Sequence, residues 1–341
     1  MIRLAAVDDS AMVREFLSSV FKDQPDIEVV DIGTNGAEAI DIVRKNKLDV
    51  LVLDLEMPGI GGLDVLKAIM QDTPLKVLVY TTHGEKSLAA FQALRLGALE
   101  FLNKPDNLLD GVKFESARQK LLERVRAVAA ATLQTSALDP TVAPRVPPPG
   151  DCPFTAVAIA ATSGGTTPLL PLLRSLPASM PVPVFLFPHL NSAMTAGFAE
   201  WLNSEVSVRV TVLADRSRIA SETVYVANTG RGYEIRDGHW CCVPEHAADP
   251  AAGGLDASLS HVAGVYGARL LAILLGGIGV DGIEGLATIR KAGGQVMVLD
   301  PGTAYTPDLP AAAIRQGLAS EVVPFARLGQ RVLEACAIRR T

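Results

Sequence analysis

Three aspartates near the start of the chain have the residue type and spacing of a metal-dependent phosphoryl site. Asp8 and Asp9 directly follow the apolar run 4–7, and Asp54 follows the apolar run 50–53. Such runs are typical of buried parallel strands, whose carboxyl ends gather functional groups. Carboxylates that converge there repel one another unless a cation joins them, and Mg²⁺ prefers oxygen ligands. The sequence therefore predicts a Mg²⁺ site at which one carboxylate attacks a phosphoryl donor.

Two further residues fit the same site. Thr81 ends an expected fourth strand, and Lys104 follows an expected fifth strand. A hydroxyl and an ammonium at those positions would hydrogen-bond a phosphoryl oxygen. The alternative interpretation of Asp8 and Asp9 is helix N-capping, but their occurrence in register with Thr81 and Lys104 favours the phosphoryl site.

A second set of residues has the types of an acyl-transfer site. Thr162 and Ser163 stand at an expected strand-to-helix turn, His189 follows an apolar strand, and Asp281 precedes an expected helix. A hydroxyl, an imidazole and a carboxylate that meet at strand ends form the nucleophile, base and orienting acid of ester hydrolysis. Each residue also has a simpler interpretation, as part of a turn, as a packed histidine, or as a helix cap.

The third of these segments also carries a competing signal. Gly277, Gly279 and Gly282 form a G-x-G-x-x-G pattern between a strand and a helix, and Asp300 follows 18 residues after Gly282. This pattern occurs in dinucleotide-binding sites. Asp281, however, lies where a pyrophosphate would bind at the helix N-terminus, and its charge would repel the phosphates.

Alternating strands and helices must position both sets of residues. Over the first ~110 residues we expect a parallel sheet with helices on both faces. A loop is expected over the proline- and glycine-rich segment 58–62. The expected strands are Leu4–Val7, Val29–Ile32, Val50–Leu53, Leu75–Tyr80 and Leu99–Leu102, and the expected helices are Ser10–Lys22, Ala37–Lys45 and Ser87–Leu96.

The same alternation returns near residue 151 and predicts a second doubly wound α/β domain. The expected strands are Ala156–Ala160, Val182–Phe187, Val208–Leu213, Thr223–Ala227, Leu271–Leu275 and Gln295–Leu299, and the expected helices are Pro168–Ser175, Ala193–Asn203, Leu255–Ala268 and Ile283–Ala292. Between the two parts, a helical stretch over 114–132 and a proline-rich segment read as a linker. We thus expect two doubly wound parallel-sheet domains, at 1–110 and 151–341, joined by a linker at 111–150.

Composition excludes several classes of protein. The chain has 341 residues, 49% hydrophobic and 20% charged, and a net charge of −6, which argues against broad binding to nucleic acid. The N-terminus becomes acidic at once and has no long apolar segment of a signal peptide. The longest apolar run, 270–280, is too short to cross a bilayer. These features predict a cytoplasmic protein without membrane insertion.

Four segments of the first part resemble the receiver domain of bacterial response regulators. They are DDS at 8–10, LDLEMPGIGGLD at 53–64, VYTTH at 79–83 and EFLNKP at 100–105. The resemblance implies a flavodoxin-like fold and a histidine kinase as phosphodonor. It assigns the following roles: Asp54 as phosphoacceptor, Asp9 as direct Mg²⁺ ligand with Asp8 assisting through water, the Glu56 carbonyl as a further ligand, Thr81 and Lys104 as phosphoryl contacts, and Phe101 as the switching aromatic.

Three segments of the second part are similar, in order, to the protein-glutamate methylesterases of bacterial chemotaxis. They begin at AIAATSGG (158–165), FLFPHLN (185–191) and LLGGIGVDG (274–282). The resemblance implies a Rossmann-like catalytic domain without a cofactor, which hydrolyses glutamate methyl esters on methyl-accepting chemoreceptors and often deamidates receptor glutamines. It assigns His189 as base, Asp281 as orienting acid and the backbone at Ile278 as an oxyanion donor. An unphosphorylated receiver would cover the crevice, and phosphorylation of Asp54 would release it.

The sequence departs from this family at the nucleophile. The family has A-S-T-G-G, whereas this chain has Thr162 in the nucleophile position and Ser163 one place later. Thr162 carries a methyl group that crowds the attack, and Ser163 would face the other way on an extended chain. Other polar positions also differ, at Pro188, 231–232, 253–256, Gly276 and 308–310. Two hypotheses therefore stay open: an active methylesterase, or a weak or inactive pseudo-esterase that acts as a phosphorylation-controlled binding module.

Overall fold

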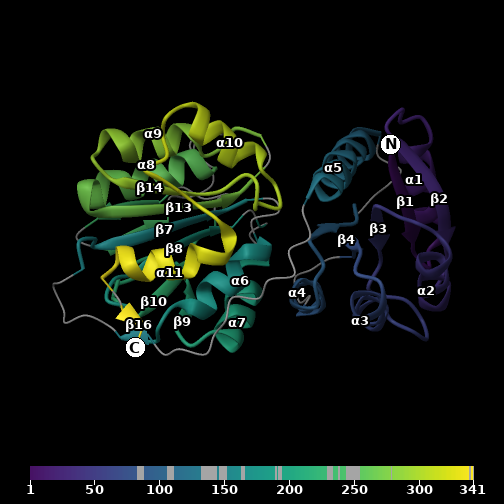
Figure 1. Cartoon of the computed structure of the whole chain (residues 1–341), viewed down its shortest axis with the longest axis horizontal. Coiled ribbons are helices and arrows are strands. Elements are labelled where there is room, and N and C mark those ends of the chain that lie inside the picture. Colours follow the sequence, from purple (N-terminus) through teal and green to yellow (C-terminus); the bar gives the residue numbers. More distant parts are fainter. Residues whose placement is uncertain are drawn as a thin grey trace. The chain divides into compact units, whose positions relative to one another are not determined.

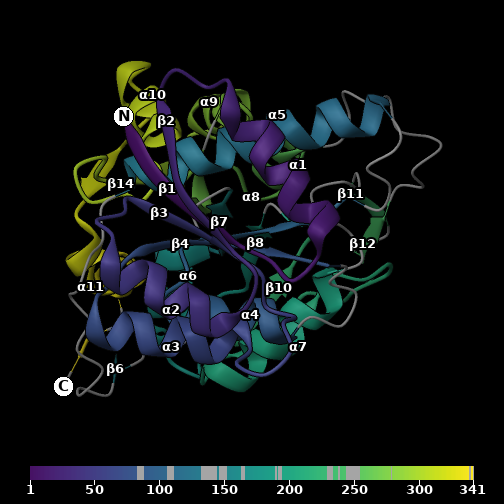
Figure 2. The ribbon, with the colours of Figure 1, turned by 90° about the vertical axis from the view of Figure 1, so that its right-hand side faces the viewer.

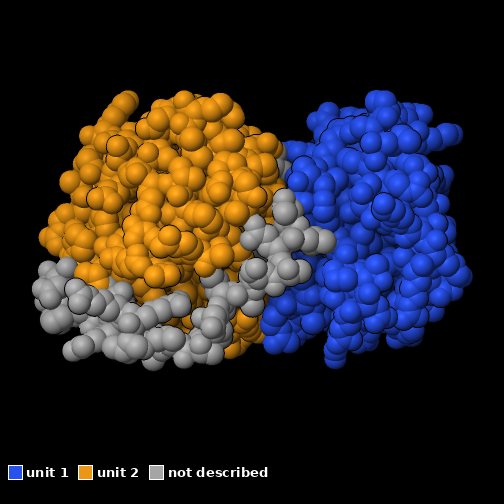
Figure 3. Space-filling view, in the orientation of Figure 1, with its two compact units in different colours: residues 1–133 blue, residues 134–341 orange. Residues whose placement is uncertain are grey.

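The computed structural model of the chain divides into two compact units, residues 1–133 and 134–341 (Figure 3). It describes residues 1–82, 88–105, 111–131, 144–145, 152–162, 166–188, 190, 194–228, 233–236, 239–242, 254–277, 279–337 and 339–340. None of the helices in these ranges is long and apolar enough to span a membrane.

Unit 1 is a five-stranded parallel sheet with the strand order β2-β1-β3-β4-β5. Helices α1 and α5 lie on one face, and α2, α3 and α4 lie on the other (Figures 1 and 2). The element bounds are β1 Ile2–Val7, α1 Ala11–Lys22, β2 Ile27–Gly33, α2 Gly36–Lys45, β3 Val50–Leu53, α3 Gly62–Asp72, β4 Lys76–Thr81, α4 Leu88–Arg95, β5 Glu100–Asn103 and α5 Gly111–Ala130. The central strand β3 is buried along its whole length, as a strand covered on both faces must be.

Two elements of unit 1 differ from expectation. The segment after β3 turns into helix α3 at Gly62, because the apolar positions of 62–72 recur with helical spacing and bury Val65, Leu66 and Ile69. Helix α5 belongs to unit 1 and not to the linker, since Leu121 and Val125 are fully buried. The boundary between the units therefore falls after 133 instead of after 110.

Unit 2 is built around a seven-stranded parallel sheet with the order β15-β14-β13-β7-β8-β10-β9. Helices α8, α9 and α10 cover one face, and α6, α7 and α11 cover the other (Figure 1). The elements up to the middle of the unit are β6 Pro144–Arg145, β7 Ala156–Ala161, α6 Thr166–Ser175, β8 Val184–Pro188, α7 Thr195–Glu205, β9 Arg209–Val212, β10 Thr223–Val226, β11 Tyr233–Arg236 and β12 His239–Cys242. The remaining ones are α8 Leu255–Tyr266, the 3-10 turn Gly267–Arg269, β13 Leu270–Gly276, α9 Ile283–Lys291, β14 Gln295–Leu299, α10 Asp308–Arg315, β15 Glu321–Val323, α11 Phe325–Ala335 and β16 Arg339–Arg340.

The strand order of unit 2 reverses direction between β7 and β13. From β7 the chain moves to β8 on one side, and it returns later to β13 on the other side. In doubly wound sheets, ligands bind at such a switch point, beyond the carboxyl ends of the strands. Both domains thus confirm the predicted fold class, two doubly wound parallel sheets.

Candidate functional sites

The strand order of unit 1 brings the predicted acidic residues together. Strands β1 and β3 are direct neighbours, and the Asp54 amide donates to the Val7 carbonyl at 3.0 Å. Asp8 and Asp54 are each only 1% exposed, whereas Asp9 faces solvent. One carboxylate oxygen from each of the three aspartates lies within 4.8 Å of the others. The carboxylates therefore form one cluster that is open to solvent on the Asp9 side.

Lys104 reaches this cluster from β5, two strands away from β3. Its Nζ lies 2.7 Å from Asp8 Oδ2 and 2.8 Å from Asp54 Oδ2. The Lys104 amide donates to the Thr81 carbonyl at 2.7 Å, which holds the ends of β4 and β5 side by side. Thr81 itself is 1% exposed. The structure thus places Thr81 and Lys104 at the same sheet edge as the carboxylates.

The charge of this cluster fits a divalent cation. Three carboxylates and one ammonium leave a formal charge of about −2, which a divalent ion would balance. All the carboxylate donors are oxygen atoms, which suits Mg²⁺. Asp8 Oδ1 also accepts from the Ser10 amide at 3.0 Å, and helix α1 has no side-chain N-cap. Asp8 and Asp9 therefore do not act as the cap of α1.

Burial and the ion pairs of this pocket shift the pKa values of Asp54 and Lys104. It raises the pKa of Asp54 above its ordinary value, against the opposing hydrogen bond and charge of Lys104. Burial alone would lower the pKa of Lys104, but its contacts with Asp54 and Asp8 outweigh that effect and raise it. Asp54 is consequently a more basic carboxylate than an exposed aspartate, held in place by a lysine that stays charged.

Two other residues named by the resemblance lie nearby. The Glu56 amide donates to Asp54 Oδ1 at 3.2 Å, and Glu56 Oε2 accepts from the Thr82 hydroxyl at 2.6 Å. The role of the Glu56 carbonyl in metal binding stays a prediction. Phe101 is half-buried and packs edge-on against Phe91 of α4, with ring centroids 5.8 Å apart. Phe101 therefore connects β5 to α4, where a switching aromatic would act.

A buried ion pair next to Phe101 was not expected from the sequence. Glu100 of β5 pairs with Arg124 of α5 at 2.9 Å, and no hydrogen-bond partner for Glu100 Oε2 is found among the described residues. Burial raises the pKa of Glu100 to about 7, although the charge of Arg124 opposes this shift. The only signal in the sequence was a charged residue at the start of an apolar strand.

This pair leads to a stability prediction. The folded-state pKa of Glu100 exceeds its ordinary value of 4.5. Its contribution to the free energy of unfolding is therefore fully present below pH 4.5 and is lost as pH rises through about 7. The loss amounts to roughly 3 kcal/mol. Glu100→Gln, which resembles the protonated form, should be more stable than wild type at pH 8 and similar at pH 4.5. Urea unfolding of the full chain across this range measures the difference.

A control for that experiment is Glu28→Gln, which breaks the half-exposed ion pair between Arg3 and Glu28. Such a pair contributes at most about 1 kcal/mol, so this variant should keep the pH dependence of wild type. An unchanged pH dependence in Glu100→Gln would contradict the assignment.

The switch point of unit 2 holds Thr162, directly after β7. Its hydroxyl donates to the Gly276 carbonyl at the end of β13, at 2.9 Å, and the residue is 8% exposed. A Cβ at Gly277 would lie 2.0 Å from Thr162 Oγ1 and 2.7 Å from Leu309 Cδ2. The absent side chain of Gly277 thus allows Thr162 to close against the neighbouring strand.

Gly277→Ala should disturb this contact. The added methyl group must displace Thr162 or Leu309, which costs about 1–3 kcal/mol of stability, as overpacking does in other cores. Thermal unfolding of the full chain measures the cost. In the double variant with Thr162→Ala, which removes the closest atom, part of the loss should be recovered. If Gly277→Ala alone unfolds at the same temperature as wild type, Thr162 and Leu309 do not pack this closely against Gly277.

Asp281 lies at the other side of the switch point, in the turn between β13 and α9. Its carboxylate accepts from two backbone amides at the start of α8, Leu255 and Asp256, each at 3.0 Å. The structure thus fixes Asp281 near the sheet edge that also carries Thr162. Its role as the orienting acid stays a prediction, because His189 lies outside the described residues. Ser163 and Ile278 lie outside them as well.

The nucleotide-binding alternative receives no support from α9. Its N-terminal region already binds a carboxylate, since the Gly285 amide donates to Asp256 Oδ1 at 2.7 Å. A pyrophosphate would need those amides. Asp300, the expected ribose ligand, accepts from the Gly302 amide at 2.9 Å within its own turn. The glycine pattern therefore serves the packing of the turn.

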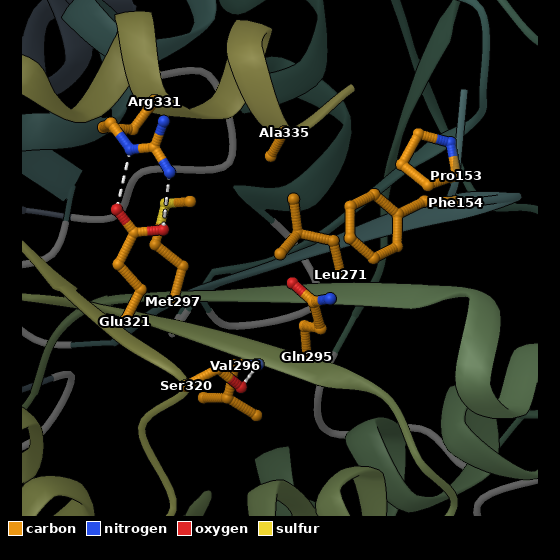
Figure 4. Close-up of a pocket in the computed structure, with 10 residues that line it drawn as sticks. All are labelled: Pro153, Phe154, Leu271, Gln295, Val296, Met297, Ser320, Glu321, Arg331 and Ala335. Carbon is orange, nitrogen blue, oxygen red and sulfur yellow. Dashed lines mark hydrogen bonds and ion pairs between the residues drawn. The ribbon is translucent and has the colours of Figure 1, made fainter. Parts of the chain in front are cut away.

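A pocket of about 170 Å³ lies at the opposite edge of the same sheet (Figure 4). Its lining includes Leu271, Gln295 and Glu321, which stand at the amino ends of β13, β14 and β15. Arg331 of α11 forms two bonds with Glu321 beside it, at 2.7 and 2.9 Å. Because Thr162 and Asp281 follow the carboxyl ends of their strands, this pocket is separate from the candidate catalytic site.

Comparisons with known proteins identify the family to which each unit is similar. The CheB methylesterase family model matches residues 157–332, and the response regulator receiver domain model matches residues 4–113. Protein-glutamate methylesterase/protein-glutamine glutaminase 3 of Paramagnetospirillum magneticum is 31% identical, over 98% of this chain and 96% of its own length. Protein-glutamate methylesterase/protein-glutamine glutaminase 1 of Caulobacter vibrioides is also 31% identical, over 99% of this chain and 99% of its own length.

Among solved structures, the chain is similar to the CheB methylesterase catalytic domain of Thermotoga maritima, with a TM-score of 0.48 and 24% identity over 53% of this chain and 98% of that one. The family matches and the full-length relatives cover both units in the same order. This chain therefore belongs to the CheB methylesterase family, with a response regulator receiver domain preceding its methylesterase domain.

Proposed function

We propose that this chain is a cytoplasmic protein that hydrolyses glutamate methyl esters on methyl-accepting chemoreceptors, under the control of Asp54 phosphorylation by a histidine kinase. Deamidation of receptor glutamines is part of the proposal, because relatives that match over nearly the whole chain are named for both activities. The observation that carries the proposal is that relatives named for these activities match over nearly the whole chain, with a receiver domain followed by a methylesterase domain.

The proposed chemistry is acyl transfer through a covalent intermediate. A hydroxyl of the 162–163 pair attacks the ester carbonyl, methanol leaves, and water then releases glutamate. His189 takes the proton of the attacking hydroxyl and returns it to the leaving methanol, and Asp281 orients His189. The Thr162 proton is directed at the Gly276 carbonyl in this structure. We therefore favour Ser163 as the attacking residue and Thr162 as its support.

The proposed switch uses the cluster in unit 1. Asp8, Asp9 and Asp54 would hold Mg²⁺, which supplies charge neutralisation for an incoming phosphoryl group. Asp54 accepts that group, and Lys104, which already contacts Asp54, pairs with the added negative charge. The phosphoryl group draws Thr81 inward, and Phe101 repacks against α4.

The test measures methanol release from methylated receptor membranes. We expect release by the full chain, with a higher rate after treatment with acetyl phosphate and Mg²⁺ and no increase in Asp54→Asn. A His189→Ala variant should lose about 10²-fold or more of the rate, as removal of a general base does. Methanol release that is the same with and without the full chain would overturn the proposal.

One observation favours a second candidate, a phosphorylation-controlled binding module without esterase activity. The Thr162 hydroxyl, at the family's nucleophile position, is buried and bonded to a backbone carbonyl. This candidate predicts binding of receptor membranes that responds to Asp54 phosphorylation, together with no methanol release. A sedimentation assay with the same membranes separates the two functions.

A further inference from the structure

Helices α8 and α9 each begin next to an aspartate that accepts hydrogen bonds from backbone amides in the first turn of the other helix. Asp281, just before α9, accepts from the amides of Leu255 and Asp256 in the first turn of α8. Asp256, in that first turn of α8, accepts in return from the Gly285 amide in the first turn of α9, at 2.7 Å. Each helix therefore caps the other, and the amides that a helix N-terminus leaves unsatisfied are satisfied by the neighbouring helix.

All three bonds join a carboxylate to backbone amides at the positive end of a helix. Bonds of this kind are shorter and stronger than neutral ones. Gly254, directly before α8, has a φ of +105°, and a Cβ there would lie 3.2 Å from Asp281 Oδ2. The backbone before α8 thus adopts a conformation that favours glycine and leaves Asp281 room to reach the helix.

We propose that Asp256 is a positioning residue of the methylesterase site, which holds the turn residues 279–282, and with them Asp281, in place for catalysis. This inference rests on the proposed function. Asp256 acts at the C-terminal end of that turn, where α9 begins at Ile283. At the other end, the Gly277 amide donates to Thr306 and the Gly277 carbonyl accepts from Leu309. The turn is therefore held at both ends, and Asp256 supplies one of the two attachments.

A purely structural role for Asp256 makes a different prediction. If Asp256 only stabilised α9, its removal would lower the unfolding temperature and leave the turnover of folded enzyme unchanged. A positioning residue instead affects kcat, since a shift of about 1 Å in a catalytic group costs about 10²-fold in rate. Because a displaced orienting acid affects the chemical step, KM should stay within about twofold of wild type.

The test compares Asp256→Ala with Asp256→Asn in the full chain, well below the unfolding temperature. We expect Asp256→Ala to lower kcat for methanol release by about 10- to 100-fold. Asp256→Asn keeps a side-chain oxygen for the Gly285 amide and should recover most of that loss. The matched control is Asp300→Ala, which removes a carboxylate bond to the Gly302 amide after the neighbouring strand β14 and should keep the wild-type kcat.

Hydrogen exchange of the turn gives a second measurement that needs no enzyme activity. Asp256→Ala should accelerate amide exchange over 279–286, and Asp256→Asn and Asp300→Ala should not. If wild type releases no methanol, the proposed function is wrong, and exchange still tests whether Asp256 holds the turn. Wild-type kcat in Asp256→Ala, or a loss in Asp256→Asn as large as that in Asp256→Ala, overturns the inference.

Discussion

Asp54→Asn is expected to abolish labelling of the chain by acetyl phosphate and Mg²⁺, with a decrease of at least about 100-fold. The substitution keeps the size of the side chain but removes the nucleophilic oxygen that lies 2.8 Å from Lys104 Nζ. Among the described residues, Asp8 is the one other buried carboxylate that contacts Lys104, and its Oδ1 atom accepts from the Ser10 amide. Phosphate incorporation measured by intact-protein mass spectrometry checks the result.

The matched control is Asp49→Asn, at the opposite end of the same strand β3. Asp49 accepts from the Arg3 amide at 2.8 Å and is exposed, so its loss should leave labelling unchanged. Asn keeps the size of Asp54, and Lys104 keeps its contact with Asp8, so we expect unit 1 to stay folded in Asp54→Asn. Thermal unfolding of the variant checks this expectation, and persistent labelling would show that another residue accepts the phosphate.

The second large effect is expected at the hydroxyl pair of unit 2. Ser163→Ala should lower kcat for methanol release by about 10³-fold or more, as removal of a nucleophile does in other hydrolases. Thr162→Val should cost less than about tenfold, because it removes one hydrogen bond, to the Gly276 carbonyl, worth about 1 kcal/mol. Valine keeps the branched shape of threonine, so the packing against Gly277 is preserved. Steady-state methanol release measures both variants.

The opposite order of the losses in kcat would instead identify Thr162 as the attacking residue. If Thr162→Val loses the larger factor and Ser163→Ala the smaller one, then Thr162 attacks after it rotates away from Gly276. Thr162→Ser provides a further check, since it keeps the hydroxyl and removes only the crowding methyl group. An increased rate in Thr162→Ser would also favour Thr162 as the nucleophile position.

Sequence patterns predicted the elements whose chemistry is local. The apolar runs of β1, β3 and β7 were correctly predicted to be strands, because a strand buried on both faces is continuously apolar. The helical nature of α5 was also recognised, but its place in unit 1 was not. An alanine-rich helix with mixed charge buries Leu121 and Val125 only because a sheet face is present to receive them.

Contacts between distant segments could not be derived in the same way. The pairing of Glu100 with Arg124 depends on how α5 lies on β5. The carboxylate–amide hydrogen bonds between α8 and α9 depend on where the two helices begin. The sequence patterns also did not predict the antiparallel strands β11 and β12. Trp240 of β12 is fully buried against Phe185 and Tyr233. These two strands have four residues each, and Trp240 packs against Phe185 of the distant strand β8.

The two α/β domains, the strand-end positions of Asp8, Asp54 and Lys104, and the substitution of threonine at the family's nucleophile position could be read from the amino-acid sequence. These follow from residue types and periodicities along the chain. The contacts of Lys104 with Asp8 and Asp54, and the bond of the Thr162 hydroxyl to Gly276, became visible only in the folded chain. Hydrogen bonds and ion pairs form over about 3 Å, so they depend on how separate segments pack.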